Sequence, residues 1–351
     1  MCGERIKTDS EAEWNDWRWQ ERNALCTPDP YPMRVTPYYM GLMKDSDRTD
    51  PIYLQAVPTA SERAENREDR PDPIGDRALA HRPAASVIHR YADRVLFVPT
   101  WECAVNCRFC FRRERFLREG GGRVSAGAIE EGLEYIAARN QIHEVILTGG
   151  DPLTLSDDAL LDIVGRLAAI GHVRLLRIHT RMPVVNPFRI DPALCRALAS
   201  VDRPLWLVTQ FNHPVELTDR AREGIAALIG AGIPVLNQSV LLKGVNDRTT
   251  ILRELFVGLA AARIKPYYLH HPDKAAGTAH FRISLRRGIE LFGRLRGTVP
   301  GYALPHYVLD IPGGFGKVPL EQAGIRPNGD GSYRVTAPDG STHTYRDDDR
   351  G

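Results

Sequence analysis

The sequence predicts an α/β protein built as a partial (β/α)6 barrel of parallel strands. Between residues 94 and 300, short runs of β-branched and apolar residues alternate with amphipathic helical segments. Such alternation is typical of parallel strands that are joined by helices and buried on both faces. Six of these units are too few for a complete eight-unit barrel, and an open doubly wound sheet is the alternative architecture.

Each expected strand is short and is followed by a helix. The strands are expected at residues 95–100, 143–150, 173–180, 205–210, 234–242 and 264–270. The helices are expected at residues 126–139, 156–169, 191–199, 216–230, 248–262 and 283–296. This order brings the carboxyl ends of the strands to one face, where the active sites of barrel enzymes lie.

The segments outside the barrel have a different character. The aromatic stretch WNDWRWQ (14–20) predicts a short helix, and breakers recur over residues 44–86, which predicts a connector with one short helix near 59–67. After Pro300 the alternation ends, and a terminal hairpin is expected over 333–345 with Asp339 and Gly340 in its turn. We expect an N-terminal helical and loop extension, a barrel and a C-terminal segment with the hairpin, at residues 1–94, 95–300 and 301–351.

Composition narrows the class of protein. The 351 residues carry a formal net charge of +2, which gives no reason to expect binding to nucleic acid or to a membrane surface. Neither a signal peptide nor an apolar run long enough to span a bilayer is present. A cytoplasmic protein is therefore expected.

Three of the six cysteines fall within eight residues, directly after the first expected strand. Cys103, Cys107 and Cys110 have CxxxCxxC spacing. A structural zinc site is the alternative, but closed zinc sites use four protein ligands. Three thiolates instead suit a four-iron cluster with one iron left open, to which S-adenosylmethionine can bind and be split into a radical. In this motif the chain resembles the radical S-adenosylmethionine superfamily.

A glycine-rich segment, TGGDP (148–152), ends the second expected strand. On its own it would be a helix entry capped by Asp151. Beside the cysteine motif it resembles the superfamily segment that binds the methionyl amino group. The resemblance implies cofactor contacts from Gly149, Gly150 and Asp151, since glycine lets backbone approach a ligand closely.

Over most of its length the chain resembles the lysine 2,3-aminomutase family. This resemblance implies an incomplete barrel, a [4Fe-4S] cluster, S-adenosylmethionine and pyridoxal 5′-phosphate. The blocks that carry it are WNDWRWQ (14–20), HRYADRVLF (89–97), CAVNCRFCFRR (103–113), TGGDPL (148–153), RIHTRMPVV (177–185), FNHPVELT (211–218), NQSVLLKGVND (237–247), PYYLHHPDKAAGTAHFR (266–282) and PGGFGK (312–317).

The resemblance implies where pyridoxal phosphate binds. Lys317 in PGGFGK matches the lysine that forms the Schiff base, for which desolvation or a neighbouring cation would prepare its amine. Arg90, Tyr91 and Arg94 match residues near the cofactor phosphate, where guanidinium groups suit a dianion. Gln238 is a further expected cofactor contact.

Substrate contacts follow in the same way. Arg112 matches the arginine that pairs with the substrate carboxylate, and Asp273 and Asp310 match the two carboxylates that hold the distal amino group of lysine. The family activity so implied is conversion of L-lysine to L-β-lysine by amino migration, through a 5′-deoxyadenosyl radical and an external aldimine. The residues around Asp273 and Gln210 depart from the usual family pattern.

Several alternatives remain open at this point. Two carboxylates could equally hold the guanidinium of arginine in an arginine 2,3-aminomutase, and another amino-acid 2,3-aminomutase of the same family is a further alternative. A lysine isomerase of the elongation factor P type is disfavoured by Asp310 beside a full PGGFGK motif. A degenerate cluster-binding regulatory protein would have no chemical need for both Lys317 and the three cysteines.

Expected partners are few. They are a small amino-acid substrate, an electron donor such as flavodoxin or ferredoxin, and a second copy of the chain in a homo-oligomer. The cysteine-rich zinc-binding extension of the family does not follow the barrel, so no structural zinc is expected.

Overall fold

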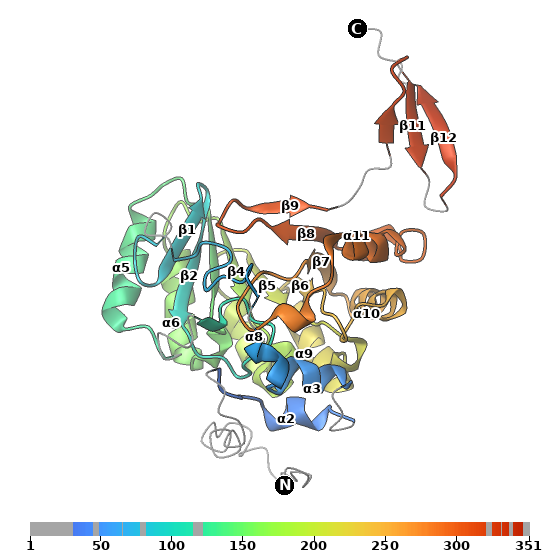
Figure 1. Cartoon of the computed structure of the whole chain (residues 1–351). Coiled ribbons are helices and arrows are strands. Elements are labelled where there is room, and N and C mark those ends of the chain that lie inside the picture. Colours follow the sequence, from blue (N-terminus) through green and yellow to red (C-terminus); the bar gives the residue numbers. More distant parts are fainter. Residues whose placement is uncertain are drawn as a thin grey trace.

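The structure is a computed structural model (Figure 1). The expected WNDWRWQ helix and the turn residue Asp339 lie outside the residues that the structure describes. Those residues are 31–44, 49–64, 66–77, 82–114, 122–320, 325–330, 332–336 and 340–346.

One nine-stranded sheet organises the fold, with the strands in chain order from β1 to β9. Strands β2 to β8 are parallel, while β1 and β9 pair antiparallel at the two edges, so these strands form an open, partial barrel as predicted. The strands are β1 Val87–Tyr91, β2 Arg94–Thr100, β3 Glu144–Gly149, β4 Leu175–His179, β5 Leu205–Thr209, β6 Val235–Val240, β7 Lys265–His270, β8 His306–Asp310 and β9 Lys317–Pro319.

All six expected helices follow their strands and cover the outer face of the sheet (Figure 1). Five of them begin after a Ser, Thr or Asp side chain that accepts a backbone N–H of the first turn, which explains where these helices start. The helices are α5 Ala126–Ala137, α6 Asp157–Ala168, α8 Pro192–Ala199, α9 Asp219–Gly230, α10 Thr249–Ala261 and α11 Leu285–Gly293.

Short helices occupy the loops and the N-terminal part. The helix expected near 59–67 is a single 3-10 turn, Ala60–Arg63, at whose start the Thr59 N–H donates to Oε1 of Glu62 at 3.2 Å. No helix in the described ranges is long and apolar enough to cross a bilayer. The other short helices are α2 Pro37–Gly41, α3 Pro51–Ala56, α7 Met182–Val185, and the 3-10 turns η5 Pro152–Thr154, η6 Pro187–Arg189, η7 Pro214–Glu216, η8 Ala279–Phe281 and η9 Gly301–Ala303.

Two expectations for the C-terminal segment need correction. The alternation does not end at Pro300, because β8 adds a seventh parallel strand beside β7 and buries Tyr307 and Val308. The apolar core of β8 spans only a few residues, too short to stand out as a strand from the sequence. The terminal hairpin is present, but it is part of a three-stranded sheet in which β10 Ile325–Pro327 joins β11 Ser332–Thr336 and β12 Thr342–Arg346.

Alternation along the parallel strands divides them between two environments. In β3, Val145 and Leu147 are fully buried in the hydrophobic core, while Glu144, Ile146 and Thr148 line an internal cavity. Successive side chains of a strand point to opposite faces. The same period-two pattern in β4 and β6, together with side chains of β7, makes the inner face of the sheet the wall of that cavity.

Candidate active site

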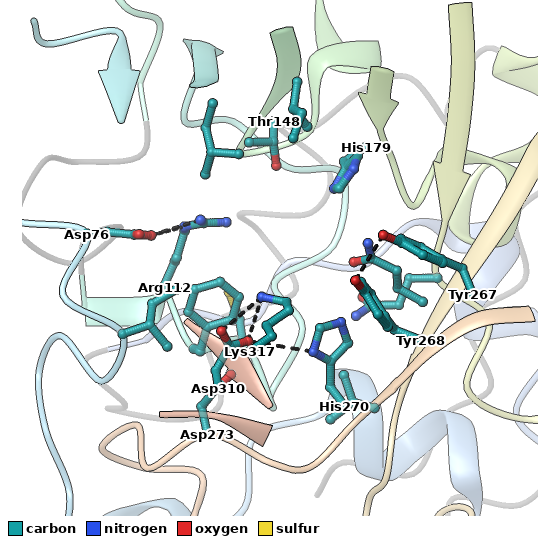
Figure 2. Close-up of a pocket in the computed structure, with 18 of the residues that line it drawn as sticks. Asp76, Arg112, Thr148, His179, Tyr267, Tyr268, His270, Asp273, Asp310 and Lys317 are labelled. Carbon is teal, nitrogen blue, oxygen red and sulfur yellow. Dashed lines mark hydrogen bonds and ion pairs between the residues drawn. The ribbon is translucent and has the colours of Figure 1, made fainter. Parts of the chain in front are cut away.

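A cavity of about 720 Å³ lies against the inner face of the sheet (Figure 2). It extends from the start of the strands to the loops at their carboxyl ends. Cys103, Gly149, Gly150 and Asp151 are not in its wall. The predicted site residues that line it are Arg90, Tyr91, Arg94, Cys107, Cys110, Arg112, Gln238, Asp273, Asp310 and Lys317.

Lys317 lies at the start of the edge strand β9, directly opposite Asp310 on β8. Its Nζ donates to both carboxylate oxygens of Asp310, at 2.9 and 2.7 Å. The Asp310 side chain is only 7% exposed. The charged group beside Lys317 is therefore a carboxylate and not the neighbouring cation considered from the sequence. The same contacts show that the space beside Asp310 accepts a primary ammonium group.

Asp273 and His270 complete this acidic end of the cavity (Figure 2). Burial, followed by the nearby Asp310 carboxylate, raises the pKa of Asp273 to about 7. The Nδ1 atom of His270 lies 3.7 Å from Asp310. Burial and the charge of Lys317 lower the pKa of His270 to about 3, so its imidazole is neutral. This end of the cavity can therefore accept an added cation.

Arg112 and Arg90 also line the cavity, and both contact Asp76. Oδ2 of Asp76 accepts Nε of Arg112 at 2.9 Å, and Oδ1 accepts Nη2 of Arg90 at 2.6 Å. The Nε of Arg90 is buried without a hydrogen-bond partner, which is a donor that an anion could use. Arg94 stacks its guanidinium on Tyr91, 4.4 Å from the ring centre. The guanidinium groups of these three arginines make this part of the cavity suitable for binding anions.

The three cysteines lie on one loop after β2 and are free thiols. Burial raises the pKa of Cys103 and raises that of Cys110 to about 11, so metal binding must displace protons. Among the described residues, no three His, Cys, Asp or Glu side chains surround a position for a single metal ion. A four-iron cluster instead binds each thiolate on a different iron, so one loop with three thiols fits it.

A buried arginine contacts the cysteine loop. Arg181 donates from Nη1 to Sγ of Cys107 at 3.0 Å. Its other amino group is held by Tyr39, Gln55 and Glu216, at distances of 2.8 to 2.9 Å. Arg181 therefore fixes a positive charge beside a sulfur atom of the cysteine loop.

A second buried ion network supports the same loop. Arg108 is fully buried and pairs with Glu62 at 2.5 Å, and Arg113 contacts the same carboxylate at 2.7 Å. The Arg108 backbone N–H donates to Gln55 at 2.9 Å. This network ties the cysteine loop to the N-terminal segment, and no local sequence motif marks Glu62 as its centre.

The glycine-rich segment after β3 packs against the cysteine loop. A Cβ at Gly150 would lie 2.2 Å from the Glu102 carbonyl oxygen, and Gly149 has φ +113°. Asp151 accepts the hydroxyl of Thr180 and the N–H of Arg181, each at 2.7 Å. The glycines therefore allow close approach of two protein segments, and the Asp151 carboxylate ties β3 to β4.

Sequence motifs did not single out the polar side chains that the strands themselves point into the cavity. Their signal is present, because polar residues recur at every second position of otherwise apolar strands. His179 is the most notable, since its Nε2 is buried without a hydrogen-bond partner. Cavity residues of this kind are Thr148, Arg177, His179, Tyr268 and His270.

Comparisons with known proteins agree with this arrangement. The Radical SAM superfamily model matches residues 97–255. An L-lysine 2,3-aminomutase from Clostridium subterminale is 39% identical over 90% of this chain and 80% of its own length. The chain belongs to the lysine 2,3-aminomutase family. An L-lysine 2,3-aminomutase from Fusobacterium nucleatum is 40% identical over 89% of this chain and 77% of its own length. A glutamate 2,3-aminomutase from Clostridioides difficile is 36% identical over 90% of this chain and 78% of its own length.

Family membership makes the protein an enzyme, an isomerase of the radical S-adenosylmethionine type. It also implies the predicted cofactors: a four-iron cluster, S-adenosylmethionine and pyridoxal phosphate. The chemistry of the cavity fits them. Three thiols share one loop, a lysine amine reaches the interior, and a buried guanidinium N–H is free to bind a phosphate.

Proposed function

We propose that this protein moves the α-amino group of L-lysine to the β-carbon and so produces L-β-lysine. The observation that carries the proposal is the arrangement of charge in one cavity. Lys317 lies with two carboxylates, and two arginines joined by Asp76 line the same cavity, within a chain of the aminomutase family. An amino acid with a basic side chain matches that arrangement.

Residue roles toward the cofactors follow from position. Cys103, Cys107 and Cys110 would hold the cluster, with Gly149, Gly150 and Asp151 at the S-adenosylmethionine side. Lys317 would attach pyridoxal phosphate, with its phosphate near the partnerless Nε of Arg90 and near Arg94 and Tyr91. Gln238 on β6 lines the same cavity and would be a further cofactor contact. When bound, these cofactors supply a carbon-centred radical and a ring system that stabilises it during nitrogen migration.

Arg112 would bind the substrate carboxylate through its guanidinium. Asp273 and Asp310 would bind the distal ammonium. When the amine of Lys317 is engaged elsewhere, buried Asp310 loses the cation that holds it at 2.7 Å. A buried carboxylate without a partner is costly, so the substrate ammonium stabilises the site by taking that place.

The same charges select among amino acids. A glutamate side chain would add a negative charge beside Asp273 and Asp310, which is unfavourable at close range. A neutral His270 adds no positive charge to offset it. The acidic end therefore favours lysine, and arginine is the competing substrate that an assay must separate.

The proposed function also implies an electron donor, a cellular location, an oligomeric state and a division of labour along the chain. A flavodoxin or ferredoxin would reduce the cluster, and the enzyme would work in the cytoplasm as a homo-oligomer. The extension 1–94 would contribute phosphate binding, the barrel, which continues past residue 300 into β8, would contribute radical generation, and the C-terminal segment would contribute the pyridoxal lysine. The contact of Arg90 with the cavity and the position of Lys317 support this division.

The test is a substrate panel with anaerobically reconstituted protein. L-Lysine, L-arginine and L-glutamate are each incubated with S-adenosylmethionine and a reductant, and products are identified by mass and retention. Formation of L-β-lysine is expected, with more than about a hundredfold loss in Asp310→Asn, since an unpaired charge costs several kcal/mol. Conversion of arginine but not lysine would refute the substrate assignment, and absence of any amino migration would refute the function.

A further inference from the structure

The connector before β1 carries an acidic residue that joins the two anion-binding arginines. We propose that Asp76 is a positioning residue that holds Arg90 and Arg112 at a fixed separation. The proposal rests on the proposed function, in which Arg90 serves the cofactor phosphate and Arg112 the substrate carboxylate. Those two anions belong to one cofactor–amino acid pair, so the spacing of their arginines matters.

The contacts are direct and buried. The Asp76 side chain is 5% exposed. Its Oδ1 accepts Nη2 of Arg90 at 2.6 Å, and its Oδ2 lies 2.9 Å from Nε and 2.8 Å from Nη2 of Arg112 (Figure 2). Each carboxylate oxygen thus holds one guanidinium, and such charge-assisted bonds fix geometry as well as energy.

The carboxylate of Asp76 also sets the net charge of the group that it forms with Arg90 and Arg112. The three groups together keep a net positive charge, which can still attract an anion. Without Asp76, two cations would face each other in a buried place and move apart. The partnerless Nε of Arg90 is a donor that this arrangement leaves for a ligand.

The backbone around Asp76 is itself anchored. The Asp76 N–H donates to Asp72 at 3.0 Å. Gly75 has φ +71°, and a Cβ there would lie 2.8 Å from the carbonyl oxygen of Gly313, four residues before Lys317. The Gly313 N–H donates to Pro73 at 2.9 Å. Asp76 is therefore fixed relative to the loop that carries Lys317.

The same connector reaches the acidic end of the cavity. The Arg70 N–H donates to the carbonyl oxygen of Lys274, next to Asp273, at 2.8 Å. Residues 70–76 thus touch the Asp273 loop and the Lys317 loop, while Asp76 contacts the cysteine loop and β1 through the two arginines. A displaced Asp76 would change both anion sites together.

The test compares Asp76→Asn and Asp76→Glu with Asp69→Asn. Asp69 is a matched control, because it lies in the same connector and pairs with Arg282 rather than with a cavity arginine. Three quantities are measured on reconstituted enzyme: the dissociation constant of pyridoxal phosphate by visible absorbance, KM for L-lysine, and the inhibition constant of L-lysinamide, which lacks the carboxylate charge. Iron per chain and the melting temperature are recorded for each variant.

We expect Asp76→Asn to weaken pyridoxal phosphate binding and to raise KM for L-lysine, each by about tenfold. The inhibition constant of L-lysinamide should change much less, Asp76→Glu should recover part of the loss, and iron content should match that of Asp69→Asn. The proposal would be overturned if Asp76→Asn left both the pyridoxal phosphate dissociation constant and KM for L-lysine unchanged. It would also be overturned if KM for L-lysine and the inhibition constant of L-lysinamide rose equally while iron per chain fell. A wild-type protein that does not convert lysine would refute the proposed function instead, while the pyridoxal phosphate measurement would still test the link from Asp76 to Arg90.

Discussion

Replacing Asp273 by Asn should change the pH dependence of the protein's stability. The Asp273 carboxyl is half-buried near Asp310, and its pKa is raised from 3.8 to about 7. When the pKa of a carboxyl is higher in the folded chain than in the unfolded chain, there is a pH range in which only the unfolded chain has released the proton. In that range the free energy of unfolding falls as pH rises. Replacing Asp273 by Asn removes this charge and keeps the shape of the side chain.

The magnitude follows from the two pKa values. Below pH 4 the folded and unfolded chains both keep the proton, so the charge costs nothing. From pH 4 to pH 7 only the unfolded chain ionises, and stability falls by about 1.4 kcal/mol for each pH unit. Above pH 7 the full cost is present, so Asp273→Asn should be more stable than wild type by up to about 4 kcal/mol.

Urea unfolding of the ligand-free protein between pH 4 and pH 8.5 measures this difference. Asp202→Asn is the control, since the Asp202 side chain is fully exposed. The control should follow wild type at every pH, and the free energy of unfolding of Asp273→Asn should diverge from it as pH rises. A difference that is the same at pH 4.5 and pH 8 would refute the electrostatic reasoning, whatever its size.

Three further outcomes are expected. Glu62→Gln leaves two buried arginines without their carboxylate and should lower the free energy of unfolding by about 3–5 kcal/mol in urea titrations; a loss below about 1 kcal/mol would show that the network is solvated. Gly150→Ala should reduce iron per chain after reconstitution, whereas Gly165→Ala, where an added Cβ meets nothing within 4 Å, should not; equal iron in both would contradict the packing argument. Arg181→Gln removes a charged donor from the Cys107 sulfur and should lower the reduction potential of the cluster in a titration followed by electron paramagnetic resonance; an unchanged potential would argue against that contact.

The sequence predicted the fold where its signal was periodic. Apolar runs alternating with amphipathic segments located all six strand–helix units, because each strand buries one face in the hydrophobic core and each helix buries one face against the sheet. The pattern missed β1 and β8, which are short and mix polar with apolar residues. These strands are stabilised by pairing with neighbours, and that pairing is not visible in a local window of sequence.

Local motifs contain several residues that line the cavity. The residues of this kind are Cys107, Cys110, Arg112 and Lys317. Each was recognised because a motif of a few residues carries the chemistry of its side chains. Asp273 and Asp310 were expected to converge from separate loops, and the structure brings both to the same end of the cavity. What each group holds there stays a prediction for the experiments above.

The sequence by itself determined the class of chemistry, since three thiols at fixed spacing and a lysine in a glycine-rich loop are properties of short segments. Only the tertiary structure decided how charge is distributed around them. It pairs Lys317 with Asp310, and it joins Arg90 to Arg112 through Asp76. Such contacts depend on distances between segments far apart in the chain, and burial then gives those charges their strength.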